Sequence, residues 1–271
     1  MDVHELYQLK KTTPEGIAAL LKSNMVITSD IACATPPAIV SALAERAVKA
    51  DLHGIVMNTS LDLRPMSFYT DPAAAQHIKG VAWFAGGCSR NAIAEGYADF
   101  FPSYYYDDSR IIEDYYSYDM VVFTVSPMDK HGYFSFGATA SAISSTLKKT
   151  KMICVEVNPN MPRAVNAPFI HISQITALCE NDAPLPVLPP SKPDDVSLTI
   201  GNYIADEIPN GATIQLGIGA IPDAVGLALK DKHNLGIHTE MFTDSMVELM
   251  ECGAVDNSRK PIHTGSSVTT F

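Results

Sequence analysis

A glycine-rich segment near the end of the sequence has the composition of an anion-binding loop. Residues 217–222 read GIGAIP, after a short apolar run and before a helical pattern. Such a loop directs free backbone N–H groups toward a ligand at the start of a helix. Pro222 takes the place of the third glycine of G-x-G-x-x-G, and no Gly-Lys-Ser/Thr follows, so the pattern predicts neither a dinucleotide fingerprint nor a P-loop. A tight strand-to-helix turn that only needs glycine is an equal alternative.

A glutamate about twenty residues further on could supply a reactive carboxylate. Glu240 follows the apolar run 235–237 in LGIHTEM, and ligands of open α/β sheets bind at the carboxyl ends of strands. A carboxylate there can act as a nucleophile, a base or a metal ligand. His238 would share its strand face, but the P-C-x-x-C segment that completes the H-x-E site of zinc deaminases is absent, so no metal site is predicted. An ordinary solvated glutamate is the alternative.

A third polar segment follows the strongest apolar run of the first half of the chain. Asp129, Lys130 and His131 lie within SPMDKHGYFSFG (126–137). The position after a buried strand suggests a sheet edge, and a solvated turn is the alternative. The segment contains no G-x-S-x-G, which disfavours a serine hydrolase.

Tyrosines between positions 104 and 118 are interspersed with acids. They could line a pocket or an oligomer interface, but we favour an edge loop that packs its rings on the core. The residues are Tyr104, Tyr105, Tyr106, Tyr115, Tyr116 and Tyr118, with Asp107, Asp108, Glu113 and Asp114.

Composition excludes several classes of protein. The chain has 271 residues, 46% of them hydrophobic, and 19 Lys+Arg against 30 Asp+Glu, for a net charge of −11. Such an acidic chain without a long basic cluster is not expected to bind nucleic acid. No apolar stretch is long enough to span a membrane, and the N-terminus MDVHELYQLKK does not resemble a signal peptide. The five cysteines have no C-x-x-C spacing, so a zinc ribbon is excluded and a cytoplasmic location is expected.

The elements that would position these residues alternate between strands and helices. Nearly continuous apolar runs such as VVFTV indicate strands covered on both faces, so the first part of the chain predicts a doubly wound α/β domain. Thr35 is predicted to cap the helix that starts at Pro36. The predicted strands are Met25–Ser29, Gly54–Thr59, Lys79–Ala85, Met120–Ser126 and Lys151–Asn158, and the predicted helices are Pro36–Lys49, Asn91–Phe100 and Thr139–Lys148.

A proline-rich segment separates two parts of the chain. Residues 184–193 read PLPVLPPSKP, with five prolines that exclude a helix or an interior strand. We therefore place a linker near 183–195 and two domains at 1–190 and 191–271. The second part predicts helices over Val196–Glu207, Asp223–Lys232 and Ser245–Met250 and strands over Thr213–Leu216, Leu235–His238 and Ser267–Phe271. Three strands make a thin sheet, so we expect the front part of a longer, cleaved or two-chain protein.

Five segments in order along the chain together resemble one family, and the resemblance covers nearly the whole chain. They read VSPMDKHGYFSFG (125–137), EVNPNMPR (156–163), HISQITALCEND (171–182), QLGIGAIPDAV (215–225) and LGIHTEMFTD (235–244). The chain is similar to the acetyl-CoA hydrolase/transferase group of class I CoA-transferases. Within that group it most resembles the 4-hydroxybutyrate and butyrate CoA-transferases.

The resemblance implies two open, mostly parallel α/β sheets, the second incomplete in this chain, with the active site in the cleft between them. It implies CoA transfer between an acyl-CoA, such as acetyl-CoA or butyryl-CoA, and a small carboxylic acid, such as acetate or 4-hydroxybutyrate. The family nucleophile maps to Glu240, which would form a glutamyl-CoA thioester and must be ionised but poorly hydrated. No metal and no permanently bound cofactor are implied, because the CoA thioester is itself a substrate. The loop residues expected to face it are Gly217, Ile218, Gly219, Ala220 and Ile221.

Two departures from the family pattern carry their own expectations. The segment after the glutamate usually reads S-D-G, whereas residues 243–245 read TDS, so the loop behind the nucleophile is expected to tilt. The family's second glycine-rich segment, G-G-x-G-G-Q-x-D-F, has no counterpart here. A C-terminal polypeptide would then complete the site. Exposed sheet edges also lead us to expect a homo-oligomer.

Three alternatives follow from the same residues. Water could attack the same intermediate, which would make the protein an acyl-CoA hydrolase. A ligand-sensing relative without catalysis would have no need of Glu240. An NAD-dependent dehydrogenase is disfavoured by Pro222. Acetate, butyrate, 4-hydroxybutyrate, succinate and itaconate all fit the chemistry, and a dicarboxylate would need a further cation, for which Arg163 or Lys130 is available.

Overall fold

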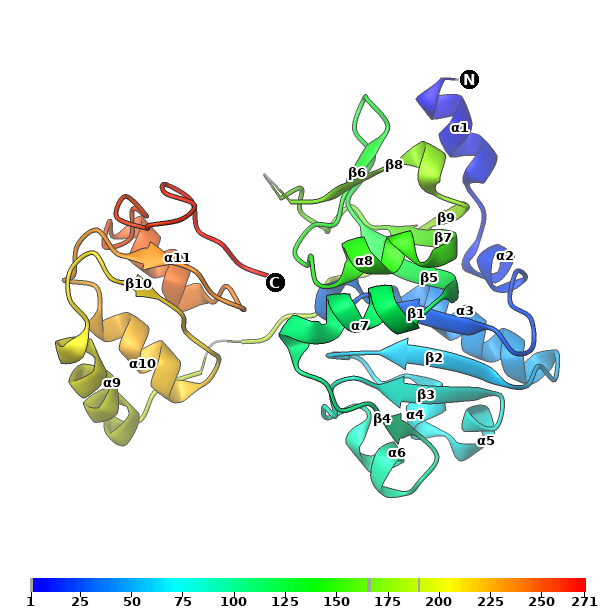
Figure 1. Ribbon diagram of the computed structural model, residues 1–271, viewed down its shortest axis with the longest axis horizontal. Coiled ribbons are helices and arrows are strands. Elements are labelled where there is room, and N and C mark those ends of the chain that lie inside the picture. Colours follow the sequence, from blue (N-terminus) through cyan, green and yellow to red (C-terminus); the bar gives the residue numbers. More distant parts are fainter. Residues whose placement is uncertain (1, 165–166, 190) are drawn as a thin grey trace. The chain divides into compact units, whose positions relative to one another are not determined.

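The computed structural model describes residues 2–164, 167–189 and 191–271. Its contacts divide the chain into two compact units, Met1–Pro186 and Val187–Phe271 (Figure 1). The division falls within the proline-rich segment 184–193.

The N-terminal unit is built on a parallel sheet that, among the described residues, has seven strands in the order β4-β3-β2-β1-β5-β7-β9 (Figure 1). The first strand lies in the middle, between β2 and β5, and the chain extends the sheet in both directions from it. This is the doubly wound arrangement predicted from the sequence, with its switch point at the carboxyl end of β1. The strands are β1 (Val26–Ser29), β2 (Ile55–Thr59), β3 (Ile78–Ala82), β4 (Asp99–Phe100), β5 (Tyr118–Val125), β7 (Thr150–Val157) and β9 (Ala177–Glu180).

Helices cover both faces of this sheet, which explains the continuous apolar runs of its central strands. Alternate residues of β5 face opposite sides: Met120 and Val122 join the core beneath α3, while Val121 and Phe123 join the core beneath α8. Figure 1 shows α7 and α8 in front of the sheet and α3 behind it. The helices are α1 (Val3–Lys10), α2 (Pro14–Ala18), α3 (Pro37–Lys49), α4 (Ser67–Thr70), α5 (Pro72–Ala75), α6 (Arg90–Ala94), α7 (Asp108–Tyr115) and α8 (Ile143–Lys148).

Several local predictions for the N-terminal unit are wrong. The helix predicted over Thr139–Lys148 begins only at Ile143, and the strand predicted over Lys79–Ala85 ends at Ala82. The helix predicted over Asn91–Phe100 ends at Ala94, because Gly96 at φ +83° turns the chain and residues 99–100 pair with β3 as β4. Thr35 does not cap α3. The carboxylate of Glu156 on β7 instead accepts the N–H groups of Ala38 (3.0 Å) and Ile39 (3.2 Å).

Some elements were not predicted at all. Strand β9 extends the sheet beyond β7, and an antiparallel pair forms between β6 (Tyr133–Ser135) and β8 (Phe169–His171). Short 3₁₀ turns lie at Ala32–Ala34, Tyr105–Asp107 and Ile172–Gln174.

The C-terminal unit has two short parallel strands, paired Thr213 to Gly236 and Ile214 to Ile237. The second, incomplete sheet is therefore as predicted, although the strand predicted over Ser267–Phe271 is reduced to a single bridge between His238 and Val268. The elements are α9 (Asp195–Glu207), β10 (Thr213–Ile214), α10 (Ala220–Ala228), β11 (Gly236–Ile237) and α11 (Asp244–Glu251). Among the described residues, no helix has the length and apolar character that crossing a membrane would require.

Candidate functional site

Glu240 lies three residues beyond the end of β11, on the carboxyl side of the parallel pair. Its side chain is exposed, and its carboxylate makes no hydrogen bond or ion pair with the residues that the structure describes. The resemblance led us to expect a poorly hydrated glutamate, whereas Glu240 of this chain is exposed to water. A free carboxylate at a sheet edge is open to attack an electrophile.

The glycine-rich segment lies at the same edge, because it follows β10 as Glu240 follows β11. Helix α10 begins at Ala220, three residues earlier than predicted, with Pro222 in its first turn, where a proline is tolerated. Gly219 precedes the helix at φ +118°, a backbone conformation that other residues rarely adopt. Space in front of Gly217 and Gly219 is open, since a Cβ at either position would meet nothing within 4 Å.

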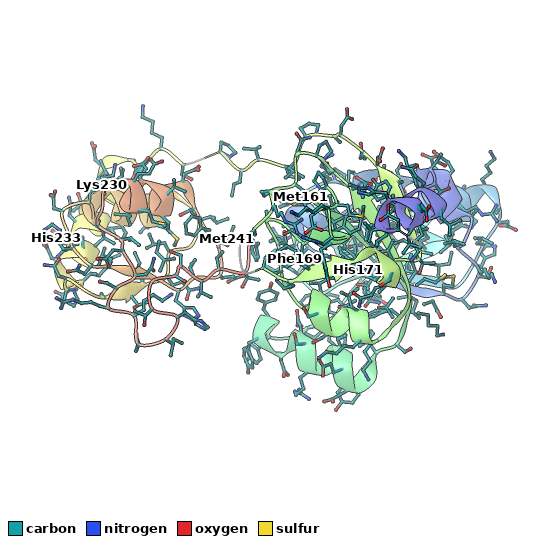
Figure 2. All side chains as sticks on the ribbon, turned by 90° about the horizontal axis from the view of Figure 1, so that it is seen from above. Met161, Phe169, His171, Lys230, His233 and Met241 are labelled. Atoms are coloured by element: carbon teal, nitrogen blue, oxygen red, sulfur yellow. The ribbon has the colours of Figure 1, made fainter. Side chains whose placement is uncertain are left out.

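Thr239 joins the two halves of this candidate site. Its buried hydroxyl lies within hydrogen-bonding distance of the carbonyl oxygens of Leu216 (3.3 Å) and Met241 (2.9 Å). Leu216 directly precedes the glycine-rich segment, and Figure 2 labels Met241, which directly follows Glu240. The structure therefore brings together Glu240 and the loop that begins at Gly217.

The last residues of the chain hold the backbone of Glu240. Its carbonyl oxygen accepts the N–H groups of Thr270 (3.1 Å) and Phe271 (3.2 Å) and the Thr269 hydroxyl (3.1 Å). The neighbouring N–H of Thr239 donates to Val268 (2.9 Å). These bonds fix the backbone and leave the side chain free.

A buried lysine fixes the strand that leads to Glu240. The ammonium group of Lys260, which is only 3% exposed, donates to the carbonyls of Ile237 (2.8 Å) and Ser266 (2.6 Å). Burial lowers the pKa of this ammonium group. Asn257 accepts the Ile237 N–H (2.9 Å) and donates to the Ser267 hydroxyl (3.1 Å). Lys260 and Asn257 therefore tie β11 to the terminal segment.

Ser245 stands at the position where the family pattern has glycine, and the expected tilt of the loop stays a prediction. It lies in the first turn of α11, where its hydroxyl lies 3.0 Å from that of Thr243. Helix α10 makes room for it, because a Cβ on Gly226 would lie only 2.6 Å from the Cβ of Ser245. A glycine on the neighbouring helix thus accommodates this departure.

Sequence reasoning missed a small cavity, with a volume of about 40 Å³, at the carboxyl edge of the N-terminal sheet. Ser29 and Asp30 at the end of β1 and Asn58 on β2 line it, and each has a buried side-chain atom without a hydrogen bond within the described residues. Burial raises the pKa of Asp30 to about 7. The strand sequences ITSD and MNTS, which end in polar residues, were the available signal.

A second buried acid lies close by in the sequence. The Asp62 carboxylate accepts the Thr59 hydroxyl (2.7 Å), and burial raises its pKa to about 7 as well. Buried polar groups of this kind are usually paired, so unpaired ones at a sheet edge indicate a place for a polar ligand group.

The cluster at 129–131 is a turn before β6. Asp129 accepts the N–H groups of His131 and Tyr133 (both 2.9 Å) and forms an ion pair with Arg163 (2.6 Å). The Arg163 guanidinium also lies 4.8 Å from the ring centroid of Phe169, which Figure 2 labels. Arg163 is therefore ion-paired within the N-terminal unit, and its binding of a dicarboxylate stays a prediction.

The tyrosine cluster divides into two groups. Tyr118 is buried and stacks on Tyr116, as a loop packed on the core would require. The rings of Tyr104, Tyr106 and Tyr115 are 73–82% exposed, so the core-packing interpretation is wrong for them.

A doubly wound parallel sheet followed by a smaller unit with two parallel strands defines a two-unit α/β protein. The chain belongs to the acetyl-CoA hydrolase/transferase family, whose N-terminal domain model matches residues 1–189. It is 42% identical to a succinyl-CoA:cyclohexane-1-carboxylate CoA transferase of Geobacter metallireducens, over 98% of this chain and 60% of that protein.

Two further proteins show the same relationship. A 4-hydroxybutyrate coenzyme A transferase of Clostridium kluyveri is 37% identical over 100% of this chain and 63% of that protein. The crystal structure of RipA from Yersinia pestis superposes with a TM-score of 0.94 at 34% identity, covering 100% of this chain and 65% of RipA. The chain thus spans 60–65% of the length of these relatives.

Proposed function

We propose that this chain carries the nucleophile of a CoA-transferase, which moves CoA from an acyl-CoA to a small carboxylic acid. The observation that carries the proposal is the free, exposed carboxylate of Glu240 beside the open glycine-rich loop. The names of two relatives support it, because both are CoA transferases that act on acyl-CoA and carboxylate substrates.

The chemistry needs a carboxylate and amide donors and no transferred proton. A carboxylate oxygen of Glu240 attacks the thioester carbonyl carbon, the C–S bond breaks, and CoA thiolate leaves an acyl-glutamyl anhydride. The thiolate then attacks the glutamyl carbonyl carbon and releases the donor acid as its carboxylate, which leaves a glutamyl-CoA thioester. An acceptor carboxylate repeats the two steps in reverse and regenerates Glu240.

The loop geometry suits the charge that develops on the carbonyl oxygen. The open space at Gly217 and Gly219 allows a thioester to approach the backbone closely. Free N–H groups at the start of α10 would stabilise an oxyanion there, and such donors typically contribute about 3 kcal/mol each. Desolvation of Glu240 would come from the bound substrate or from chain beyond this sequence.

Trapping the thioester tests the proposal directly. The chain and the full-length product of its gene are incubated with acetyl-CoA, treated with borohydride to reduce any thioester to an alcohol, digested and analysed by mass spectrometry. We expect reduction at Glu240 alone. The variant Glu251→Gln, which removes another exposed glutamate from α11, should leave the label in place. An unmodified Glu240 in the full-length protein would overturn the proposal and favour a ligand-sensing relative.

Hydrolysis is a second candidate, because the exposure of Glu240 gives water access to the same intermediate. The two activities separate when acetate is added to a reaction with butyryl-CoA. A transferase converts the acyl-CoA to acetyl-CoA, whereas a hydrolase continues to release free CoA at the same rate.

A further inference from the structure

Two histidines and an aspartate meet at the amino edge of the N-terminal sheet. Asp51 and His53 lie in the loop between α3 and β2, and His77 directly precedes β3. Strands β2 and β3 are parallel neighbours with Ile55 opposite Ile78 (Figure 1), so the residues that precede them lie side by side. One potential ligand atom of each of the three side chains lies within 4.8 Å of the other two.

The two imidazoles already face one another. Their ring centroids are 4.9 Å apart with an angle of 24° between the planes. The Nε2 atom of His53 lies 2.9 Å from a carboxylate oxygen of Asp51. Both side chains are exposed, at 59% for His53 and 82% for Asp51, so an ion from solution could reach them.

The remaining histidine is held by its other nitrogen. The Nδ1 atom of His77 lies 3.0 Å from the carbonyl oxygen of Leu52. Because a carbonyl only accepts hydrogen bonds, this contact places the proton on Nδ1 and leaves the lone pair of Nε2 free. A backbone carbonyl that orients an imidazole in this way is typical of metal-binding histidines.

We propose that Asp51, His53 and His77 bind a divalent transition-metal ion of the Zn²⁺ type. Two imidazole nitrogens and one carboxylate oxygen suit Zn²⁺, Cu²⁺ or Ni²⁺, whereas Mg²⁺ and Ca²⁺ prefer oxygen ligands. Bonds of about 2.0–2.1 Å in a tetrahedral site require ligand atoms roughly 3.4 Å apart, so side-chain rotation closes the site. Water would take the fourth position.

The place of this site in the fold indicates a structural role. It joins the loop before β2 to the start of β3, at the edge of the sheet opposite Asp30 and Asp62. An ion held there would stabilise the folded N-terminal unit in proportion to its binding free energy. The inference is independent of CoA transfer.

Zinc titration of the whole chain, by calorimetry and by thermal unfolding, tests the site. The variants are chosen to preserve the fold. Asp51→Asn keeps a residue that tolerates the local φ of +52°, and His77→Asn keeps an N–H close to the position of Nδ1. We expect one zinc ion per chain, a rise in melting temperature on adding zinc, and at least about tenfold weaker binding in each variant.

His263→Asn is the matched control, because His238 and His263 form another imidazole pair, 6.2 Å between centroids, in the C-terminal unit, and asparagine tolerates the φ of +52° at position 263. Binding should be unchanged in this variant. Equal zinc affinity in all four proteins, loss of binding in His263→Asn alone, or no binding at stoichiometric zinc would each overturn the proposal.

Discussion

Replacing Asp30 by asparagine should stabilise the N-terminal unit at neutral pH and flatten its pH dependence. Asp30 is 4% exposed, accepts the Ile31 N–H (2.9 Å) with one carboxylate oxygen and leaves the other without a hydrogen bond among the described residues. Burial raises its pKa from 3.8 to about 7. Asparagine keeps the acceptor for Ile31 and has the same shape, so the substitution removes mainly the charge.

The sign and size of the effect follow from this pKa. Between 3.8 and about 7 the unfolded chain gives up its proton while the folded chain keeps it. The free energy of unfolding is therefore highest below pH 3.8 and falls as pH rises through about 7. A shift of about three pKa units corresponds to about 4 kcal/mol in all, of which about 2–3 kcal/mol is lost between pH 5 and pH 8. Asp62, with the same raised pKa, adds a comparable slope that the Asp30→Asn variant retains.

Urea unfolding at pH 5 and pH 8, followed by tryptophan fluorescence, measures this difference. Trp83 is the single tryptophan of the sequence and stacks on Phe101 within the N-terminal unit, so its signal reports on that unit. Asp182→Asn, which alters an exposed aspartate of the same unit, is the control. If Asp30→Asn shows the same loss of stability between the two pH values as the unmodified chain, Asp30 is not a buried acid of raised pKa.

Five other substitutions in the C-terminal unit have expected outcomes in denaturant unfolding. Gly219→Ala should lower the free energy of unfolding by about 1–3 kcal/mol, because a φ of +118° strains an alanine. Gly217 has open space around it and no positive φ. Gly217→Ala should therefore change the free energy of unfolding by less than about 0.5 kcal/mol and act only on the proposed CoA transfer. Gly226→Ala should lower the free energy of unfolding by about 1–3 kcal/mol, because the new Cβ overlaps Ser245. Adding Ser245→Gly should recover most of that loss. If the effects of the two substitutions simply add, the contact between positions 226 and 245 is not the cause. Lys260→Met should cost about 2–4 kcal/mol by leaving two carbonyls unpaired, and an unchanged midpoint would show that water replaces the ammonium group.

The sheet of the N-terminal unit was largely predictable because its strands are buried on both faces. β5 and β7 read as continuous apolar runs, and the predicted spans differ from the observed ones by one or two residues at each end. β4 could not be predicted in the same way. Asp99 and Phe100 are exposed, so they form no apolar run, and the strand is defined by its pairing with β3. The cap of α3 by Glu156 is a contact between residues about 118 positions apart and leaves no local pattern.

The sequence indicated which residues of the candidate site could do chemistry, but not which hydrogen bonds hold them in place. That Glu240 and the glycine-rich loop share an edge follows from two short apolar runs paired in parallel. Their roles in catalysis stay predictions. The hydrogen bonds from Thr239 to Leu216 and from Lys260 to Ile237 join residues that are distant in the sequence. A threonine or a lysine at such a position gives no local pattern that predicts these bonds. The histidines of the proposed metal site are 24 positions apart and meet only through the register of β2 with β3.

The bonds from residues 269–271 to the carbonyl of Glu240 have a consequence for biosynthesis. These residues are translated about thirty positions after the glutamate they hold, so on the ribosome the candidate nucleophile emerges before its backbone can be fixed. Bringing together the two ends of a segment of that length costs more chain entropy than forming a helix, whose contacts are local. The carboxyl end of β11 is therefore expected to be among the last parts of its unit to become ordered, and a nascent chain released before Phe271 would contain Glu240 without a defined position for it.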